Sequence, residues 1–117
     1  MNKYDTFRRL HQRSALLVIP NPWDIGTAKI LQHAGFEALA TTSAGFACSQ
    51  GLADHQVSAA AMLDHCRDIV EATPLPVSAD LGKGFGDTPE AVADTIARAA
   101  STGLAGCSIE DLSLIHI

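Results

Sequence analysis

Two acidic side chains stand where buried strands are expected to end. Asp80 ends the short run that follows Pro76, and Glu110 ends a second run that begins at Gly106. The carboxyl ends of parallel strands share one edge of a sheet, so these two carboxylates are expected to lie close together. Converging carboxylates repel each other unless a cation lies between them. Since Mg²⁺ is typically bound by one or two carboxylates together with water and an anionic ligand, the pattern predicts a magnesium site.

The loop after Asp80 has glycine at positions 82, 84 and 86. This GxGxG spacing differs from the GxGxxG of dinucleotide-binding turns, and Lys83 lacks the following Ser or Thr of a P-loop. We interpret the loop as a segment that moves, or is closely approached, beside a metal site. The alternative is purely structural: Asp80 would cap a loop and Glu110 would be a solvated strand end. Asp111 is expected to face away from its neighbour, because adjacent strand residues point in opposite directions.

The elements that must position these residues alternate along the chain. After a first helix over 2–12, strands are predicted at 15–19, 38–42, 77–80 and 106–110. Helices are predicted to start at the capping residues Asp24, Ser58 and Thr88. This alternation implies a parallel α/β sheet with right-handed crossovers. The apolar run 15–19 is expected to be buried on both faces. Residues 43–57 are predicted to form a long loop without regular structure, as in lids over functional sites.

The blocks of the chain resemble, in order, the N-terminal part of the isocitrate lyase/phosphoenolpyruvate mutase family, over roughly residues 10–111. The resemblance runs through Asn21-Pro22-Trp23-Asp24, Ala40-Thr41-Thr42-Ser43-Ala44-Gly45, Asp54, Pro76-Val77-Ser78-Ala79-Asp80, Gly84-Phe85-Gly86 and Gly106-Cys107-Ser108-Ile109-Glu110-Asp111. It implies a TIM (β/α)8 barrel and a Mg²⁺-dependent lyase or mutase. Such an enzyme cleaves or forms C–C or P–C bonds of 2-oxo or 2-hydroxy acids through an enolate held on the metal.

The resemblance also assigns roles to residues. Asp80 and Glu110 would hold the metal, and Asp54 would be a catalytic acid on a gating loop, with Asp80 counted as catalytic too. The substrate carboxylate would be bound by Ser43, with backbone amides near Ala44 and Gly45. Trp23 is expected at the same site. The metal would act as a Lewis acid, and the lid would exclude water.

The length of the chain, 117 residues, is about half of the 250 that such a barrel needs. We therefore expect residues 1–111 to be the N-terminal half of a barrel truncated after its fourth strand, and residues 112–117 to be a tail of different origin. Lyases of this family carry a Lys-Lys-Cys-Gly-His-like loop and a substrate-binding arginine after that point, so the fragment itself is expected to be inactive. Full length, the protein would be a homo-oligomer.

Two other classes of function stay open. The chain could be a non-catalytic half-barrel that associates with a partner through its open sheet edges. It could also be a nucleotide-binding unit that uses the glycine loop.

Composition narrows the choice of partners. With 8 basic and 13 acidic residues, the formal net charge is −5, which argues against nucleic acid. No apolar stretch approaches the ~20 residues of a membrane span. The three cysteines lack metal-site spacing and are expected to be reduced thiols, packed as small hydrophobes in a cytoplasmic protein. The family resemblance implies a small carboxylic acid as the ligand.

Overall fold

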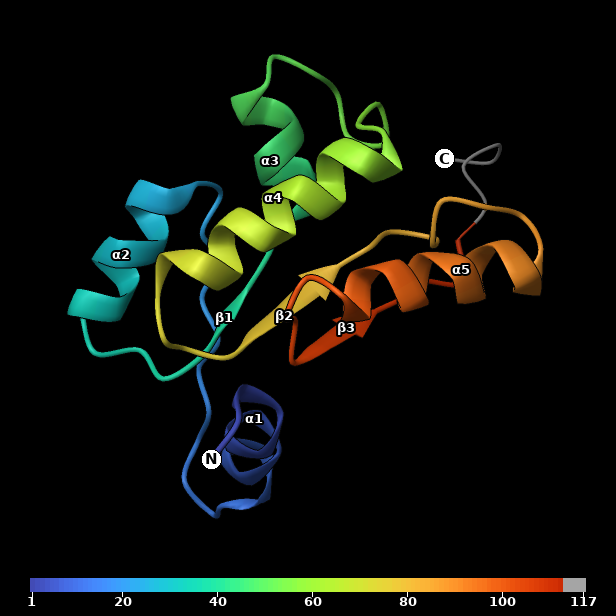
Figure 1. Ribbon diagram of the computed structural model, residues 1–117. Coiled ribbons are helices and arrows are strands. Elements are labelled where there is room, and N and C mark those ends of the chain that lie inside the picture. The colour runs from blue at the N-terminus through green and yellow to red at the C-terminus, as the bar shows by residue number, and fades with distance from the viewer. Residues whose placement is uncertain (113–117) are drawn as a thin grey trace.

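The computed structural model describes residues 1–112 and shows a parallel three-stranded sheet with helices (Figure 1). The helices are α1 (Lys3–Gln12), α2 (Ile25–His33), α3 (Ser43–Ser49), α4 (Ala59–Ala72) and α5 (Pro89–Ala100); the strands are β1 (Leu39–Ala40), β2 (Val77–Asp80) and β3 (Gly106–Ser108). The strand order is β1-β2-β3, and both pairings are parallel. The predicted parallel α/β class is therefore confirmed. Residues 113–117 of the predicted tail lie outside the described residues.

Three helices begin at the predicted capping residues. The side chain of Asp24 accepts the backbone N–H of Thr27, and Ser58 and Thr88 accept the equivalent N–H groups of α4 and α5. Pro89 occupies the first turn of α5. Each cap satisfies an N–H that has no partner inside its own helix, which is why these residue types mark helix starts.

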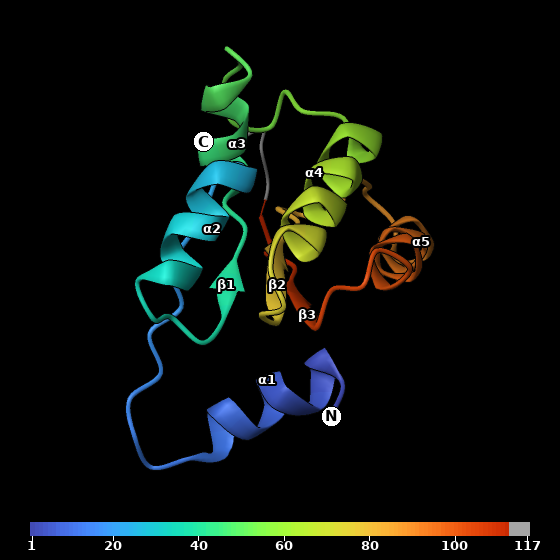
Figure 2. The same ribbon diagram turned by 60° about the vertical axis from the view of Figure 1, so that its left-hand side comes forward.

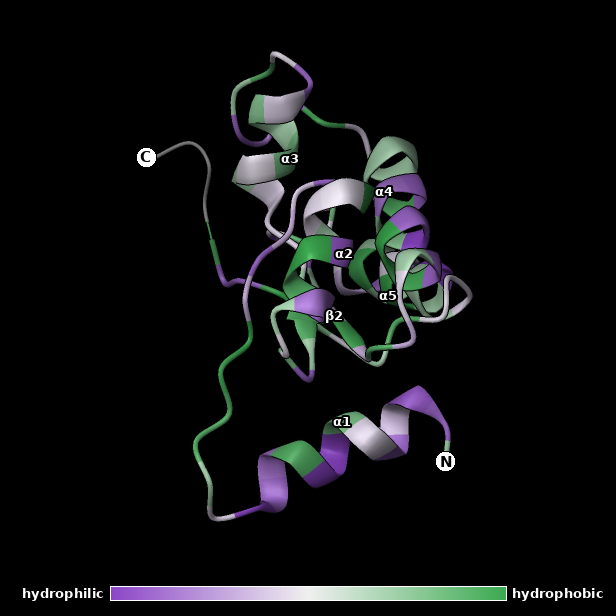
Figure 3. Cartoon of the chain, turned by 90° about the vertical axis from the view of Figure 1, so that its left-hand side faces the viewer, coloured by the Kyte–Doolittle hydropathy of each residue, from purple (hydrophilic) through white to green (hydrophobic). Residues whose placement is uncertain are grey.

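The prediction of a strand at 15–19 is wrong. The side chains of Leu16 and Val18 are 84% and 54% exposed rather than buried, and Figure 3 shows this hydrophobic stretch running outside the body of the chain between α1 and α2. A backbone hydrogen bond from Ala40 N to Pro20 O (3.0 Å) ties the end of the segment to β1. Pro20 and Pro22 have no N–H to donate, so a regular ladder cannot continue there.

The prediction that 43–57 is an unstructured loop is also wrong in its first half. Residues Ser43–Ser49 form helix α3, capped by Thr42, whose Oγ1 accepts the N–H of Gly45 at 3.1 Å. A Cβ at position 45 would lie 2.6 Å from Cγ2 of Thr42, so the cap needs glycine there. The strands predicted at 38–42 and 106–110 are shorter in the structure, where they are β1 and β3. Glu110 therefore lies two residues beyond β3.

Helix α4 is the centre of the packing. It contacts α2, α5 and β2, and its buried side chains include Met62, Cys66 and Ile69. They pack with buried residues of the sheet and its loops such as Leu39, Val77 and Leu81, all at most 1% exposed. Burial of this apolar face is the main stabilising term expected for the sheet.

Helix α1 lies across the amino-terminal ends of the strands, apart from the other helices (Figure 2). None of its residues is buried. The ammonium group of Lys3 donates to the carbonyls of Val70 (2.7 Å) and Thr73 (3.0 Å) at the end of α4. Phe7 lies against β3, since a Cβ at Gly106 would be 3.4 Å from its ring. In the part of the chain that the structure describes, no helix is long and apolar enough to cross a membrane.

Candidate functional site

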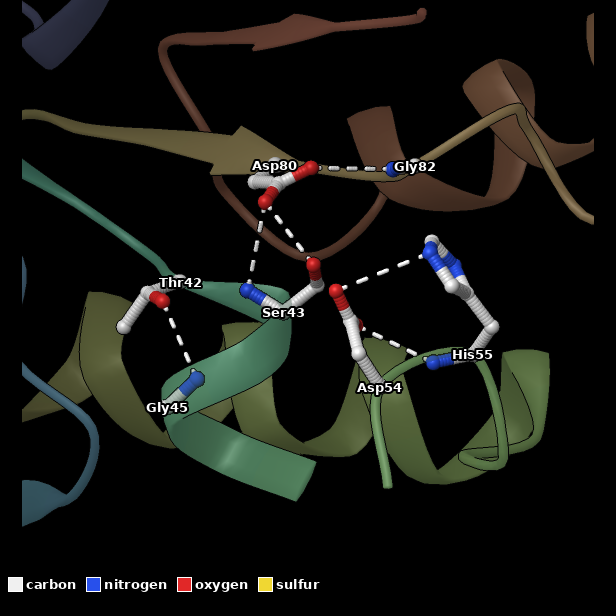
Figure 4. Close-up of polar contacts among 7 residues, drawn as sticks. All are labelled: Thr42, Ser43, Gly45, Asp54, His55, Asp80 and Gly82. Atoms are coloured by element: carbon white, nitrogen blue, oxygen red, sulfur yellow. Dashed lines mark hydrogen bonds and ion pairs between the residues drawn. The ribbon is translucent and has the colours of Figure 1, made fainter. Parts of the chain in front are cut away.

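Asp80 is the centre of a hydrogen-bond network at the carboxyl end of β2 (Figure 4). Its Oδ2 accepts from the hydroxyl of Ser43 (2.9 Å) and the backbone N of Ser43 (3.3 Å), and its Oδ1 accepts from Gly82 N (3.0 Å). The backbone N of Asp80 donates to the hydroxyl of Thr41 at 3.0 Å. The sequence predicted Ser43 and Asp80 as separate members of one site, and the structure brings them into direct contact.

A tight turn after α3 carries Asp54. Gln56 N donates to Ala53 O (3.2 Å), and Ala53 N donates to the side-chain oxygen of Gln56 (2.8 Å). The imidazole Nε2 of His55 lies 3.6 Å from Oδ2 of Asp54, and the backbone N of His55 donates to Asp54 Oδ1 at 3.0 Å. The turn therefore presents a carboxylate and an imidazole as a pair.

A pocket of about 130 Å³ lies between this turn and the loop after β2. Its lining is Ser43, Asp54, His55, Val57, Met62, Leu81, Gly82, Lys83 and Phe85. Apolar side chains make up one part of the wall and charged or hydrogen-bonding groups the other. An apolar cavity with a few convergent polar groups is the usual form of a small-molecule site, and this one is smaller than the ~300–1,000 Å³ of drug-sized sites.

Glu110 meets the loop after β2 through its backbone. Glu110 N donates to Gly82 O at 2.7 Å, and Leu81 N donates to Ser108 O at 3.3 Å. The carboxyl ends of β2 and β3 thus meet as expected. The side chain of Glu110 is exposed and lines a different depression, together with Asp87 and Asp111. The structure does not place it in the hydrogen-bond network of Asp80.

The residues present suit a hard cation. Within residues 1–112, no group of three or more His, Cys, Asp or Glu side chains is arranged to hold a metal. Mg²⁺ does not require such a group, because it commonly takes one or two carboxylates and completes its coordination with water and substrate oxygens. Asp80, at the end of β2, and Glu110, two residues beyond β3, both carry carboxylate oxygens of the kind that Mg²⁺ takes, but the structure does not bring the two side chains together.

The expected substrate-binding amides are partly engaged. Gly45 N donates to the hydroxyl of Thr42, and Ser43 N donates to Asp80. Ala44 lies between them in the first turn of α3. Trp23 is 47% exposed and lines a separate depression beside the start of α2, so the structure does not bring it into the pocket with Ser43.

Two residues of the pocket with titratable side chains, His55 and Lys83, were not among the residues predicted for the site. Lys83 lines both the pocket and the depression at Glu110, and its ammonium group is paired with Asp87. His55 adjoins Asp54 in the sequence, and that adjacency in a polar loop is the signal that could have identified it.

His65 and Cys66 are buried in α4 and lie outside this pocket. His65 stacks on Phe46 with ring centroids 3.9 Å apart, and burial lowers the pKa of its imidazole. Burial raises the pKa of the Cys66 thiol to about 12. All three cysteines are free, but Cys48 and Cys107 are exposed, which contradicts the expectation that all three are packed inside. Cys48 lies in α3 and Cys107 in β3.

Comparison with protein families gives one consistent result. The family model described as phosphoenolpyruvate phosphomutase matches residues 7–115. A 2-methylisocitrate lyase of Halalkalibacterium halodurans is 36% identical over 111 residues, which are 94% of this chain and 37% of the lyase. A candidate lyase/mutase structure from Burkholderia cenocepacia J2315 is 56% identical, with a TM-score of 0.93, over 96% of this chain and 40% of that one.

A more distant structure shows the same fold. It is a phosphonopyruvate hydrolase in complex with oxalate and Mg²⁺, 22% identical, with a TM-score of 0.92, over 97% of this chain and 40% of that one. The chain spans well under half of the length of the curated relatives it matches, 30–41%.

Proposed function

The chain belongs to the phosphoenolpyruvate mutase/isocitrate lyase family, and on that premise we propose that it is the N-terminal half of a Mg²⁺-dependent TIM-barrel enzyme. The enzyme would break or form C–C or P–C bonds of small 2-oxo or 2-hydroxy acids by way of an enolate. The observation that carries the proposal is the hydrogen bond from Ser43, which lines a small pocket, to Asp80 at the end of β2. The name of the Halalkalibacterium halodurans relative, a 2-methylisocitrate lyase, supports this class of reaction.

The hydrogen bond between Ser43 and Asp80 suggests how substrate binding begins. The Ser43 hydroxyl donates a hydrogen bond to Asp80. To donate a hydrogen bond to a substrate carboxylate instead, the hydroxyl must rotate so that its O–H points toward the substrate. The turn would leave Oδ2 of Asp80 with fewer hydrogen bonds and a free lone pair. Mg²⁺, held by Asp80 and Glu110, would supply positive charge beside the substrate oxygens.

Other residues would shape and close the pocket. Asp54 lies on the turn that forms one wall, and its carboxylate side chain is 38% exposed. Movement of that turn would admit the substrate, and its return would exclude water. The apolar wall of Val57, Met62 and Leu81 suits the hydrocarbon part of a small acid. The 117-residue chain alone is proposed to have little or no turnover.

Magnesium binding to the chain itself tests the proposal. Calorimetric titration with MgCl₂ is expected to show binding that Asp80→Asn weakens by about 10- to 100-fold. Asp94→Asn is the matched control, because Asp94 is exposed on α5, and it is expected to bind like the unaltered chain. Equal weakening in both variants, or none in Asp80→Asn, would refute the metal assignment. In a protein that joins this chain to the rest of a barrel, Asp80→Ala is expected to abolish turnover of a 2-methylisocitrate-like acid.

An apolar groove favours a second candidate function, a half-barrel that associates through its open sheet edge. The groove lies between α5 and β3 and is lined by Ile96, Ala99, Leu104 and Cys107, among others. Ile96 is 41% exposed. Sedimentation equilibrium distinguishes this candidate: self-association that Ile96→Glu abolishes would favour it, and a folded monomer would count against it.

A further inference from the structure

His55 occupies a backbone conformation that its residue type disfavours. Its φ is +70°, and it is the third residue of the Ala53–Gln56 turn, a position where glycine is usual. A residue with a side chain adopts this conformation at a cost in stability, and such strain concentrates at functional sites. Glycine would form the same turn without that cost, so the imidazole itself calls for an explanation.

The ring of His55 has two distinct sides. Nε2 lies 3.6 Å from Oδ2 of Asp54, and Nδ1 lies 4.0 Å from the position that a Cβ would take at Gly82. Figure 4 shows the ring between the Asp54 turn and the loop that carries Gly82. With the N–H on Nε2, toward Asp54, the lone pair of Nδ1 is left on the side of Gly82, and both residues line the pocket.

From this arrangement we propose that His55 is a general base of the pocket, oriented by Asp54, for a substrate that carries a hydroxyl group. The inference rests on the proposed function and names its substrate class as 2-hydroxy acids. Asp54 then becomes a positioning residue, and the proton acceptor that touches the substrate is Nδ1 of His55. A carboxylate that orients an imidazole and stabilises the imidazolium is a recurring device in acid–base catalysis.

The reaction step balances without a further reagent. The O–H bond of the substrate breaks, and its proton moves to the lone pair of Nδ1. The electron pair left on oxygen forms a C=O bond while the adjacent C–C bond breaks. The electrons of that C–C bond remain on the departing carbon as an enolate, and the imidazolium proton can then be returned to that carbon.

The first test measures binding, since it does not require turnover. Malate and succinate differ only in the hydroxyl group, and each is titrated into the ¹⁵N-labelled chain and followed by NMR. Malate is expected to bind about 3- to 10-fold more tightly, as one net hydrogen bond provides. His55→Gly is expected to remove this preference while the fold becomes no less stable. His33→Ala, at the exposed end of α2, is expected to keep it.

The second test observes the ring directly and needs no ligand. At pH 8.5, the imidazole ¹⁵N shifts of His55 are expected to show the proton on Nε2, and Asp54→Ala is expected to reduce that share. A proton mainly on Nδ1 would overturn the inference, because Nδ1 could not then accept another.

The outcomes separate the two proposals. If malate keeps its preference in His55→Gly, the role of His55 is refuted and the proposed function stands. If neither malate nor succinate binds, the proposed binding of small acids by this chain is contradicted. The position of the proton on the His55 ring then decides by itself whether Nδ1 is free to act as a base.

Discussion

Replacement of His65 by phenylalanine should stabilise the protein. His65 is 5% exposed, and its Nε2 is a buried side-chain atom without a hydrogen-bond partner in the described part of the protein. An unpaired buried polar atom costs about 1–3 kcal/mol relative to one that is paired or absent. Phenylalanine removes this atom and keeps the nearly parallel stacking on Phe46, whose ring planes differ by 9°.

The magnitude follows from these two terms. Removal of the unpaired nitrogen would by itself raise the free energy of unfolding by about 1–3 kcal/mol, and the stacking contact is retained. The six-membered ring of phenylalanine is larger than the imidazole and fits the buried site more tightly, so the expected net gain is about 1–2 kcal/mol. For a chain of this size, each kcal/mol raises the melting temperature by roughly 3–6 °C. Urea and thermal unfolding of both proteins at pH 7.5 measure the difference.

The pH dependence provides an independent check on the same residue. Burial lowers the pKa of His65, so the folded protein binds a proton there less readily than the unfolded chain does. The stabilisation from the neutral ring is therefore present above the unfolded pKa of about 6.5 and is lost as the pH falls through the folded value. The unaltered chain should lose stability below pH 6.5 more steeply than His65→Phe. A destabilised variant with an unchanged pH profile would refute the reasoning, and His33→Phe, on the exposed side of α2, controls for loss of a histidine.

Three other predictions concern single features of the fold. Lys3→Met removes two hydrogen bonds to carbonyls at the end of α4. It is expected to speed amide hydrogen exchange in α1 by about 3- to 10-fold. Unchanged exchange would show that these hydrogen bonds do not hold α1 in place. Gly84→Ala is expected to lower the free energy of unfolding by about 1–3 kcal/mol more than Gly51→Ala, as measured by chemical unfolding. Both glycines have positive φ, but only the Cβ at position 84 would lie 2.9 Å from a valine. Equal losses of stability in the two variants would contradict this crowding. Burial raises the pKa of the Cys66 thiol to about 12. At pH 8, a disulfide reagent should therefore label exposed Cys48 rapidly and Cys66 only in denaturant. Rapid labelling of both thiols in the folded protein would contradict the burial of Cys66.

The helix starts were predictable because each depends on a few neighbouring residues. Asp24, Ser58 and Thr88 cap their helices with bonds that span three positions, so the local sequence contains all the information. The parallel sheet was predictable from the alternation of elements. The contact of Ser43 with Asp80, 37 positions apart, then follows from the strands ending at one edge.

The wrong predictions have a different origin. They depend on which parts of the folded protein pack against a segment. The run 15–19 has the composition of a buried strand, yet Leu16 and Val18 face outward in the structure. Helix α3 was missed because glycine, serine and cysteine have low helix propensity, which the Thr42 cap outweighs. The location of Trp23 beside α2 depends on tertiary packing, which local patterns do not contain.

The attachment of α1 has a consequence for how the chain folds. The hydrogen bonds from Lys3 to Val70 and Thr73 span 67 and 70 positions, and Phe7 lies against β3 at Gly106. During synthesis, α1 emerges before these partners and cannot dock until they have followed it. Such distant contacts close slowly. Because none of its residues is buried even in the folded protein, α1 can stay in water without exposing a buried apolar face, and its docking requires that α4 and β3 are already in place.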